Sequence, residues 1–307
     1  MVKLFGVLFL AILGLTMISA RMALRATEQV SSPREPRSEW SLLLGGDVML
    51  GRSVTTNSLD TVKDPNYPFF EIGSLLRSAD LTFVNLENPI TDQCPRRNVG
   101  MVFCAPPEML SGLLYAGVDV VNLSNNHTLN YGKAGYESTK KALSEVSLSY
   151  ADHSTLATRT VKGVTVGFIG FDKSQQSKPT LTSAEEAFIL ESRKKVDVLI
   201  TAMHWGVEYN AHPTDGQRTL AQRLVELGST VVVGHHPHWV QDTTTINETP
   251  IYYSLGNLVF DQMWSEETKK GLIVKVTFDG STVTKEEFIR TYMKKVAQPI
   301  IMPSPKE

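Results

Sequence analysis

The chain has 307 residues, of which 42% are hydrophobic and 20% are charged, and its formal net charge at pH 7 is -2. This composition is typical of a globular protein and excludes general disorder. The pI near 6.4 also argues against a nucleic-acid partner, because nucleic-acid-binding domains carry a clear basic excess. The length suits one large α/β domain or two small ones.

Residues 4–20 form an uncharged apolar run with Lys3 before it and Arg21 after it. A membrane-spanning helix needs about 17–25 such residues, so the run predicts a single-pass anchor within residues 1–23. A cleavable signal peptide is the alternative, but no small-x-small site follows, since Ile18 stands two positions before Ala20. Under both interpretations the domain is exported. We therefore expect it to lie outside the cytoplasm, anchored in the cell membrane or secreted after cleavage.

A polar linker interrupted by prolines is predicted for residues 24–40, and a folded domain for residues 41–290. Short apolar runs typical of buried strands alternate with helical stretches along most of the domain. The strands are predicted at 42–44, 81–86, 118–123, 164–171, 196–203 and 230–233, and the helices at about 69–79, 106–116, 134–146, 183–195 and 216–228. Because the strand runs are continuously hydrophobic, we expect strands covered on both faces, as in a layered α/β fold.

The pattern changes after residue 250, where three strands are predicted in succession, at 251–255, 272–278 and 283–289. Asp279-Gly280 between the last two is typical of a hairpin turn. The remaining segment, 291–307, contains Pro299, Pro303 and Pro305, and we expect it to be a flexible tail.

The two cysteines, Cys94 and Cys104, are close in sequence and flank a segment that can turn. In an oxidising compartment such a pair closes a loop through a disulfide bond. The alternative is two unpaired thiols near the surface.

Five of the predicted strands end in residues that can bind metals. The endings are Asp47, Glu87, Asn125-Asn126-His127, His204 and His235-His236-Pro237-His238. Each ending alone is a weak signal, since an Asp after a strand is often a helix cap and a lone His is usually not a ligand. Together they predict one shared site, because the carboxyl ends of strands form the ligand crevice of open α/β sheets. Carboxylate and imidazole donors favour a divalent metal ion.

Six ordered motifs resemble the capsule-synthesis protein A family, associated with poly-γ-glutamate capsule production. They cover residues 41–265 and read Gly46-Asp47-Val48-Met49-Leu50-Gly51-Arg52, Asn85-Leu86-Glu87, Ser124-Asn125-Asn126-His127, His204-Trp205-Gly206-Val207-Glu208-Tyr209, Gly234-His235-His236-Pro237-His238 and Ser254-Leu255-Gly256-Asn257. The resemblance implies a layered α/β/β/α, calcineurin-like metallophosphoesterase fold. It also implies divalent ions of the Mn, Zn or Fe class.

The resemblance further implies a role for each motif residue. Glu87 stands where the metallophosphoesterase pattern has its bridging carboxylate. The remaining ligands are Asp47 and His238 for a first metal, and Asn126, His204 and His236 for a second. His127 resembles the catalytic histidine that assists the leaving group or the substrate oxyanion. The choice between His235 and His236 stays open, although the His-x-His spacing favours His236.

Met49 is the one clear departure, since it stands where the general pattern has a histidine. A thioether is a poor ligand for hard divalent ions. We therefore expect one tight and one weak metal site.

Four further residues are candidates for catalysis or substrate binding. Arg52 offers a fork suited to phosphate or carboxylate, with a surface ion pair as the alternative. Trp205 and Tyr209 are candidates for a pocket wall, with core packing as the alternative. Asn257 is expected at the site, supporting it through a hydrogen bond. The sequence has no glycine-rich nucleotide loop and no Gly-x-Ser-x-Gly elbow, which argues against P-loop and serine-hydrolase chemistry.

Two functions follow from these features. The first is a metal-dependent hydrolase that acts on an anionic envelope polymer or its precursor. The second is a non-catalytic, polymer-binding or scaffold component of a capsule synthesis or export complex, working with other membrane subunits. The ligand set favours the hydrolase and Met49 favours the scaffold. Fold alone does not decide between them.

Overall fold

The computed structural model describes residues 39–303. The predicted anchor at 1–23 and almost all of the predicted linker lie outside this range. Within it, no helix is both long and apolar enough to span a membrane.

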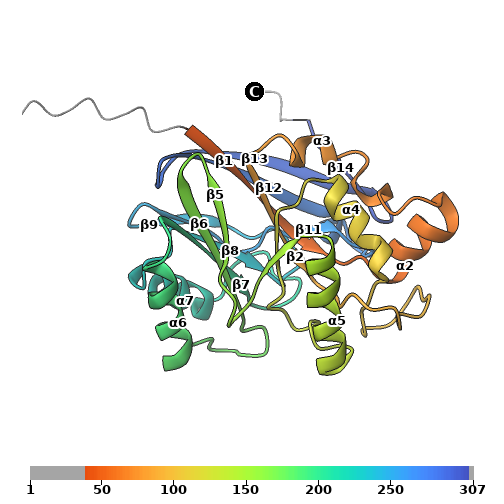
Figure 1. Cartoon of the computed structure of the whole chain (residues 1–307), viewed down its shortest axis with the longest axis horizontal. Helices are drawn as coiled ribbons and strands as arrows, with labels where there is room; N and C mark the ends of the chain where they lie inside the picture. Colours follow the sequence, from red (N-terminus) through yellow and green to blue (C-terminus); the bar gives the residue numbers. More distant parts are fainter. Residues whose placement is uncertain (1–38, 304–307) are drawn as a thin grey trace, which may run out of the picture. The chain divides into compact units, whose positions relative to one another are not determined.

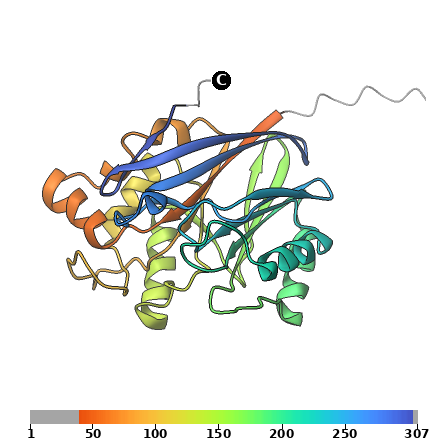
Figure 2. The same ribbon diagram turned by 180° about the vertical axis from the view of Figure 1, so that it is seen from behind.

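Two β-sheets form the centre of the domain (Figures 1 and 2). The first sheet has the order β14-β13-β12-β1-β2-β3-β4, with β11 paired beside the end of β1. Its strands are β1 (Glu39–Val48), β2 (Leu81–Leu86), β3 (Val120–Asn122), β4 (Ser149–Ala151), β11 (Asn257–Val259), β12 (Lys270–Asp279), β13 (Thr282–Lys295) and β14 (Gln298–Ile301). Neighbours from β1 to β4 are parallel, so their carboxyl ends share one edge.

The second sheet has the order β5-β6-β7-β8-β10-β9. Its strands are β5 (Ala157–Val161), β6 (Val164–Asp172), β7 (Val198–His204), β8 (Val231–His235), β9 (Thr243–Ile246) and β10 (Thr249–Tyr252). The run from β6 to β8 is parallel. This places Asp172, His204 and His235 side by side at one end.

Three apolar clusters hold the layers together. One lies between the sheets and joins Leu42, Leu44 and Phe83 of the first sheet to Phe168 and Ile200 of the second. The other two fill the spaces between each sheet and its helices. Burial on both faces explains why these strands read as continuous apolar runs.

Helices cover the outer face of each sheet. On the first sheet lie α2 (Arg52–Thr55), the π-helix η1 (Thr56–Val62), the 3-10 turns η2 (Tyr67–Phe69) and η3 (Pro107–Met109), α3 (Gly73–Leu76), α4 (Leu110–Tyr115) and α5 (Gly132–Glu145), and on the second α6 (Ser183–Arg193) and α7 (Asp215–Glu226). Capping boxes at Thr182 and Thr214 start α6 and α7 where the sequence predicts them. The short helix α8 (Glu266–Lys269) precedes β12. The order of layers is α/β/β/α, as the resemblance implies.

Two predicted elements are wrong in detail. The helix expected at 69–79 is broken into η2 and the four-residue α3. The segment 291–301, expected to be flexible, completes β13 and forms β14. Met293 and Ala297 are buried there, and this burial favours order. Pro299 is compatible with a strand because β14 is the edge of its sheet.

Candidate metal centre

The predicted donors meet where the carboxyl ends of the two sheets face each other. Asp47 belongs to the end of β1, Glu87 follows β2, and His204 ends β7. One ligand-type atom from each of these three residues lies within 4.8 Å of the other two, and all three side chains are buried.

His238 connects the two sheets on one side of the centre. Its Nδ1 lies 3.2 Å from Asp47 Oδ2 and 3.0 Å from Asn257 Oδ1, and its Nε2 lies 3.6 Å from Glu87 Oε1. Hydrogen bonding at Nδ1 fixes the ring and leaves Nε2 as the free lone pair. Asp47, Glu87 and His238, the residues assigned to the first metal, are therefore adjacent.

Asn126 and His236 flank His204 on the other side. Asn126 Oδ1 lies 2.9 Å from His204 Nε2, and the rings of His204 and His236 are 4.8 Å apart between centroids. His236 is buried, while Asn126 is half-buried. Asn126, His204 and His236, which the motifs assign to a second metal, are therefore adjacent.

Several buried polar atoms in this region lack a hydrogen-bond partner among the described residues. They are Glu87 Oε1, His236 Nδ1 and both ring nitrogens of His235. A buried polar group without a partner costs about 1–3 kcal/mol. His236 also has a left-handed backbone, with φ 97°, of the strained kind found at functional sites. Unpaired lone pairs on carboxylate and imidazole groups that converge fit a divalent cation.

Burial of these carboxylates and imidazoles close to one another also shifts their pKa values in the metal-free protein. Burial, followed by the negative charge of Asp47, raises the pKa of Glu87 well above its usual range. Burial and then His236 hold the pKa of His204 well below its usual range, and burial with His238 lowers the pKa of His236 to about 4. Burial also opposes ionisation of Asp47, but the imidazoles of His235 and His238 beside the carboxylate outweigh burial and lower the pKa of Asp47. Neutral imidazoles and ionisable carboxylates are the forms that bind metals.

Asn85 positions the carboxylates, a role that the sequence analysis did not assign. Its Nδ2 donates to Asp47 Oδ1 at 2.9 Å and to Glu87 Oε2 at 3.3 Å. Its Oδ1 accepts from Asn122 Nδ2 at 2.9 Å. A Cβ at Gly170 would overlap the Asn122 side chain, so this network needs glycine there. The alternation of strand residues is the missed signal, since Asn85 and Glu87 are two positions apart.

His235 also faces Asp47. Its Nδ1 lies 3.2 Å from Asp47 Oδ1, without the alignment of a hydrogen bond. Because both ring nitrogens of His235 are buried without a hydrogen-bond partner, His235 can offer a lone pair to a cation beside Asp47. The structure thus places both His235 and His236 at the centre, and the choice between them that the sequence left open is not exclusive.

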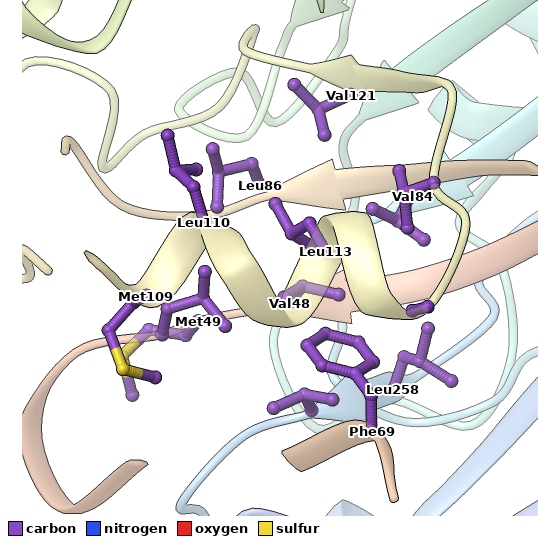
Figure 3. Close-up of a cluster of buried hydrophobic side chains, with 14 of the residues drawn as sticks. Val48, Met49, Phe69, Val84, Leu86, Met109, Leu110, Leu113, Val121 and Leu258 are labelled. Carbon is purple, nitrogen blue, oxygen red and sulfur yellow. The ribbon is translucent and has the colours of Figure 1, made fainter. Parts of the chain in front are cut away.

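Met49 does not point towards the centre. Its side chain is buried in the apolar cluster over the first sheet, beside Met109 (Figure 3). Its sulfur accepts a hydrogen bond from the backbone N–H of Gly51 at 3.0 Å. Position 49 is therefore a core position in this chain, and its thioether says little about metal occupancy.

The sequence predicts that Arg52 is free to bind a phosphate or carboxylate, but its guanidinium is already occupied. Its guanidinium makes a two-pronged ion pair with Asp261, and both side chains are nearly buried. Its Nη1 donates to the carbonyl of Gly100 at 2.8 Å. The alternative of an ion pair is the correct one, although the pair is buried rather than on the surface.

The three other substrate-binding candidates differ from one another. Trp205 is fully buried and donates from Nε1 to the carbonyl of Tyr253 at 2.9 Å, so core packing is its role. Asn257 is buried and donates to Gln262 and Thr268 while it orients His238, so it supports the centre. Only Tyr209 is half-exposed, with its ring 6.2 Å from that of His238.

His127 and the disulfide lie together on the outer side of Glu87. His127 Nε2 is 4.0 Å from Glu87 Oε1. The disulfide expected between Cys94 and Cys104 is present, with Cα atoms 5.6 Å apart, inside the range that a disulfide requires.

The domain thus has a double β-sheet between two layers of helices, with buried carboxylates and histidines at the strand ends. Two solved structures share this fold. A hypothetical protein from Thermus thermophilus has a TM-score of 0.56 and 15% identity, over 81% of this chain and 98% of its own. A structure described as a novel phosphatase from Mycoplasma pneumoniae has a TM-score of 0.53 and 16% identity, over 83% and 94%. At such identities the likeness concerns the fold alone.

Residues 41–262 match the family described as bacterial capsule synthesis protein PGA_cap, and the chain belongs to that family. Among its relatives is the capsule biosynthesis protein CapA of Bacillus anthracis, 28% identical over 89% of this chain and 72% of that protein. The PGA biosynthesis protein CapA of Bacillus subtilis (strain 168) is 31% identical over 74% of this chain and 65% of that relative.

Proposed function

We propose that this chain is a metal-dependent hydrolase of the phosphoesterase type that works in the synthesis of an anionic capsule polymer. One observation carries the proposal: Glu87 Oε1 and His236 Nδ1 are buried at one centre without a hydrogen-bond partner in the described part of the chain. Buried ligand atoms without a partner cost free energy unless a cation binds them, which supports a metal-dependent activity at this centre.

Asp47, Glu87 and His238 would hold one ion, and Glu87, Asn126, His204 and His236 a second. Bound there, divalent ions of the Mn, Zn or Fe class would supply an activated water and stabilise charge at a phosphoryl centre of a precursor or at an amide carbonyl of the polymer. The chain's own residues do the remaining work. Asn85 and Asn257 fix the orientation of the carboxylates and of His238.

His127 and Tyr209 are the residues that would handle the substrate. His127 Nε2 faces Glu87, and burial lowers the pKa of His127, so the neutral ring can accept or return a proton at a substrate oxygen. Burial and then Glu208 raise the pKa of Tyr209 to about 12. Its hydroxyl therefore stays protonated and can donate a hydrogen bond to the substrate.

The substrate and the location are part of the proposal. Two relatives are named for capsule or PGA biosynthesis, which supports an anionic envelope polymer such as poly-γ-glutamate, or its precursor, as the substrate. The apolar run at 4–20 supports a membrane anchor. The Cys94–Cys104 disulfide supports an oxidising, extracytoplasmic compartment. Other membrane subunits of capsule synthesis are the expected partners.

The test measures metal content and phosphodiester hydrolysis of the full-length protein with added Mn²⁺. His204→Ala should lower both the metal content and the hydrolysis. His212→Ala is the matched control, because that histidine is exposed and pairs with Asp242 outside the centre. It should change neither quantity.

Two results would count against the hydrolase. Wild-type protein that binds metal but hydrolyses neither a model phosphodiester nor the capsule precursor would favour the scaffold. Hydrolysis that survives His204→Ala would place the activity outside this centre.

A further inference from the structure

A loop closed by the disulfide, residues 94–104, packs directly against His127. The base of the loop is held to the domain by backbone hydrogen bonds from Thr91 to Ala105 at 3.0 Å and from Ala105 to Pro89 at 2.9 Å. Its tip is exposed, with Val99 79% accessible. Between the tip and Cys104 lies Phe103, which is buried and is the residue that reaches the centre.

Phe103 is sandwiched between two groups. Its ring stacks on His127 with centroids 3.9 Å apart and an interplanar angle of 24°. The guanidinium carbon of Arg52 lies 4.4 Å from the same centroid. Two planar groups this close to one ring centre must occupy opposite faces. The Phe103 ring therefore lies between His127 and Arg52 and limits how far the imidazole can turn.

Arg52 is itself fixed. Asp261 holds the guanidinium through the ion pair, and the Gly100 carbonyl, also within the loop, accepts from Nη1 at 2.8 Å. Two groups of the loop, the Gly100 carbonyl and the Phe103 ring, thus contact the Arg52 guanidinium. This gives Arg52 a role that its motif position alone did not indicate.

Asn130 links the loop backbone to the imidazole. Its Oδ1 accepts the backbone N–H of Phe103 at 2.6 Å and lies 2.9 Å from His127 Nδ1. A backbone N–H can only donate, so the atom facing it must be the amide oxygen. His127 must then donate from Nδ1, which leaves the Nε2 lone pair directed to the Glu87 side.

We propose that the disulfide-closed loop 94–104 is a positioning element for His127, fixing its tautomer and ring orientation through Phe103 and Asn130. The consequence for turnover rests on the proposed function, whereas the tautomer does not. Since the Cys94–Cys104 bond closes the loop, the orientation of His127, and with it the activity, becomes sensitive to thiol reductants. The backbone bonds at the loop base remain after reduction, so the effect should be smaller than that of removing Phe103.

The first experiment reads the tautomer in the metal-free, full-length protein. Proteins labelled with ¹⁵N-histidine are compared by long-range ¹H–¹⁵N correlation, with His127→Gln used to assign the signals. The wild type should show a single Nδ1–H tautomer at His127. Asn130→Ala should show a mixture of both tautomers, because the acceptor at Nδ1 is lost. Phe103→Leu keeps the backbone N–H but lets the imidazole turn away from Asn130, so it should show a partial mixture, and Cys94→Ser with Cys104→Ser a smaller one.

Two further variants separate positioning from loss of fold. Asn130→Asp keeps an oxygen acceptor and should restore the Nδ1–H tautomer. Val99→Ala, at the exposed tip of the same loop, should behave as the wild type. Metal content should stay at the wild-type value in all of these proteins, because neither the loop nor Asn130 is among the proposed ligands. An Nε2–H tautomer in the wild type, or an unchanged tautomer in both Phe103→Leu and Asn130→Ala, would overturn the proposal.

Kinetic measurements are the second experiment and test the effect of the loop on turnover. If the wild type hydrolyses a phosphodiester, Phe103→Leu should lower kcat, with KM nearly unchanged, by no more than the roughly 10²–10⁴-fold that a general acid–base group contributes. Reductant should lower kcat of the wild type but not of the double cysteine variant. A wild-type kcat that is unchanged by reductant would contradict the proposed role of the disulfide in orienting His127. Absence of turnover in the wild type would defeat the proposed function while leaving the tautomer result in place.

Discussion

His238 and His236 are two residues apart in one loop, and the protein treats them differently. His238 has hydrogen-bonding neighbours at Nδ1, from Asn257 and Asp47. His236 Nδ1 has no partner among the described residues, and its pKa falls to about 4. The orientation of His238, on the first side of the centre, is therefore set by the fold itself. His236, on the second side, keeps a free ring nitrogen whose geometry a bound ion must set.

Among substitutions on the two sides, His236→Ala should have the largest effect on metal binding. The second side would lose an imidazole that nothing else replaces, so we expect the protein to lose one bound ion while it keeps the other. Metal stoichiometry by elemental analysis checks this, with His212→Ala as the control. Loss of both ions together would show that the two sides are not independent.

Asn257→Ala should weaken the first side without emptying it. Partners that orient a ligating histidine typically contribute about 10–100-fold to metal affinity, and His238 would lose its main orienting acceptor. Competition with a chelator measures the change. An effect as large as that of His236→Ala would mean that Asn257 holds the fold rather than the ligand.

Glu87 lies between the two sides, and its raised pKa predicts the pH dependence of binding. In the metal-free protein burial and Asp47 favour the protonated carboxyl, and a bound ion must displace that proton. Affinity should thus rise with pH until the pH passes the pKa of Glu87, and then level off. Calorimetry in buffers of different ionisation enthalpy should detect proton release. Affinity that falls as pH rises would contradict this assignment.

The sequence predicted which strands end at the centre because continuous apolar runs and the donors that follow them are both local features. It also paired Cys94 with Cys104 correctly. The roles of Met49, Arg52 and Trp205 depend on where each side chain turns after the strand, which spacing does not specify. Arg52 finds its partner in Asp261, 209 residues away in sequence, and a contact that distant cannot be inferred from a motif.

Met49→His carries the smallest expected effect on metal. From the sequence alone, a histidine at position 49 would be expected to add a metal ligand. In the structure, however, the Met49 side chain lies in the core beside Met109 (Figure 3). A buried polar ring there should lower the free energy of unfolding by about 1–3 kcal/mol and leave the metal content unchanged. Met49→Leu, which conserves volume, should cost less than about 1.5 kcal/mol. Denaturant unfolding and metal analysis check both, and a gain of metal in Met49→His would restore the ligand interpretation.

The central claim is that Glu87 is shared by two groups of donors around a divalent metal. Its most direct test is the metal content of full-length wild-type protein and of Glu87→Gln, loaded and washed under the same conditions. Glutamine keeps the size of the side chain but removes the charge that both sides use. We predict bound metal in the wild type and loss of nearly all of it in Glu87→Gln, with thermal stability of the metal-free proteins nearly equal. Equal metal content in the two proteins, or none in the wild type, would contradict the account.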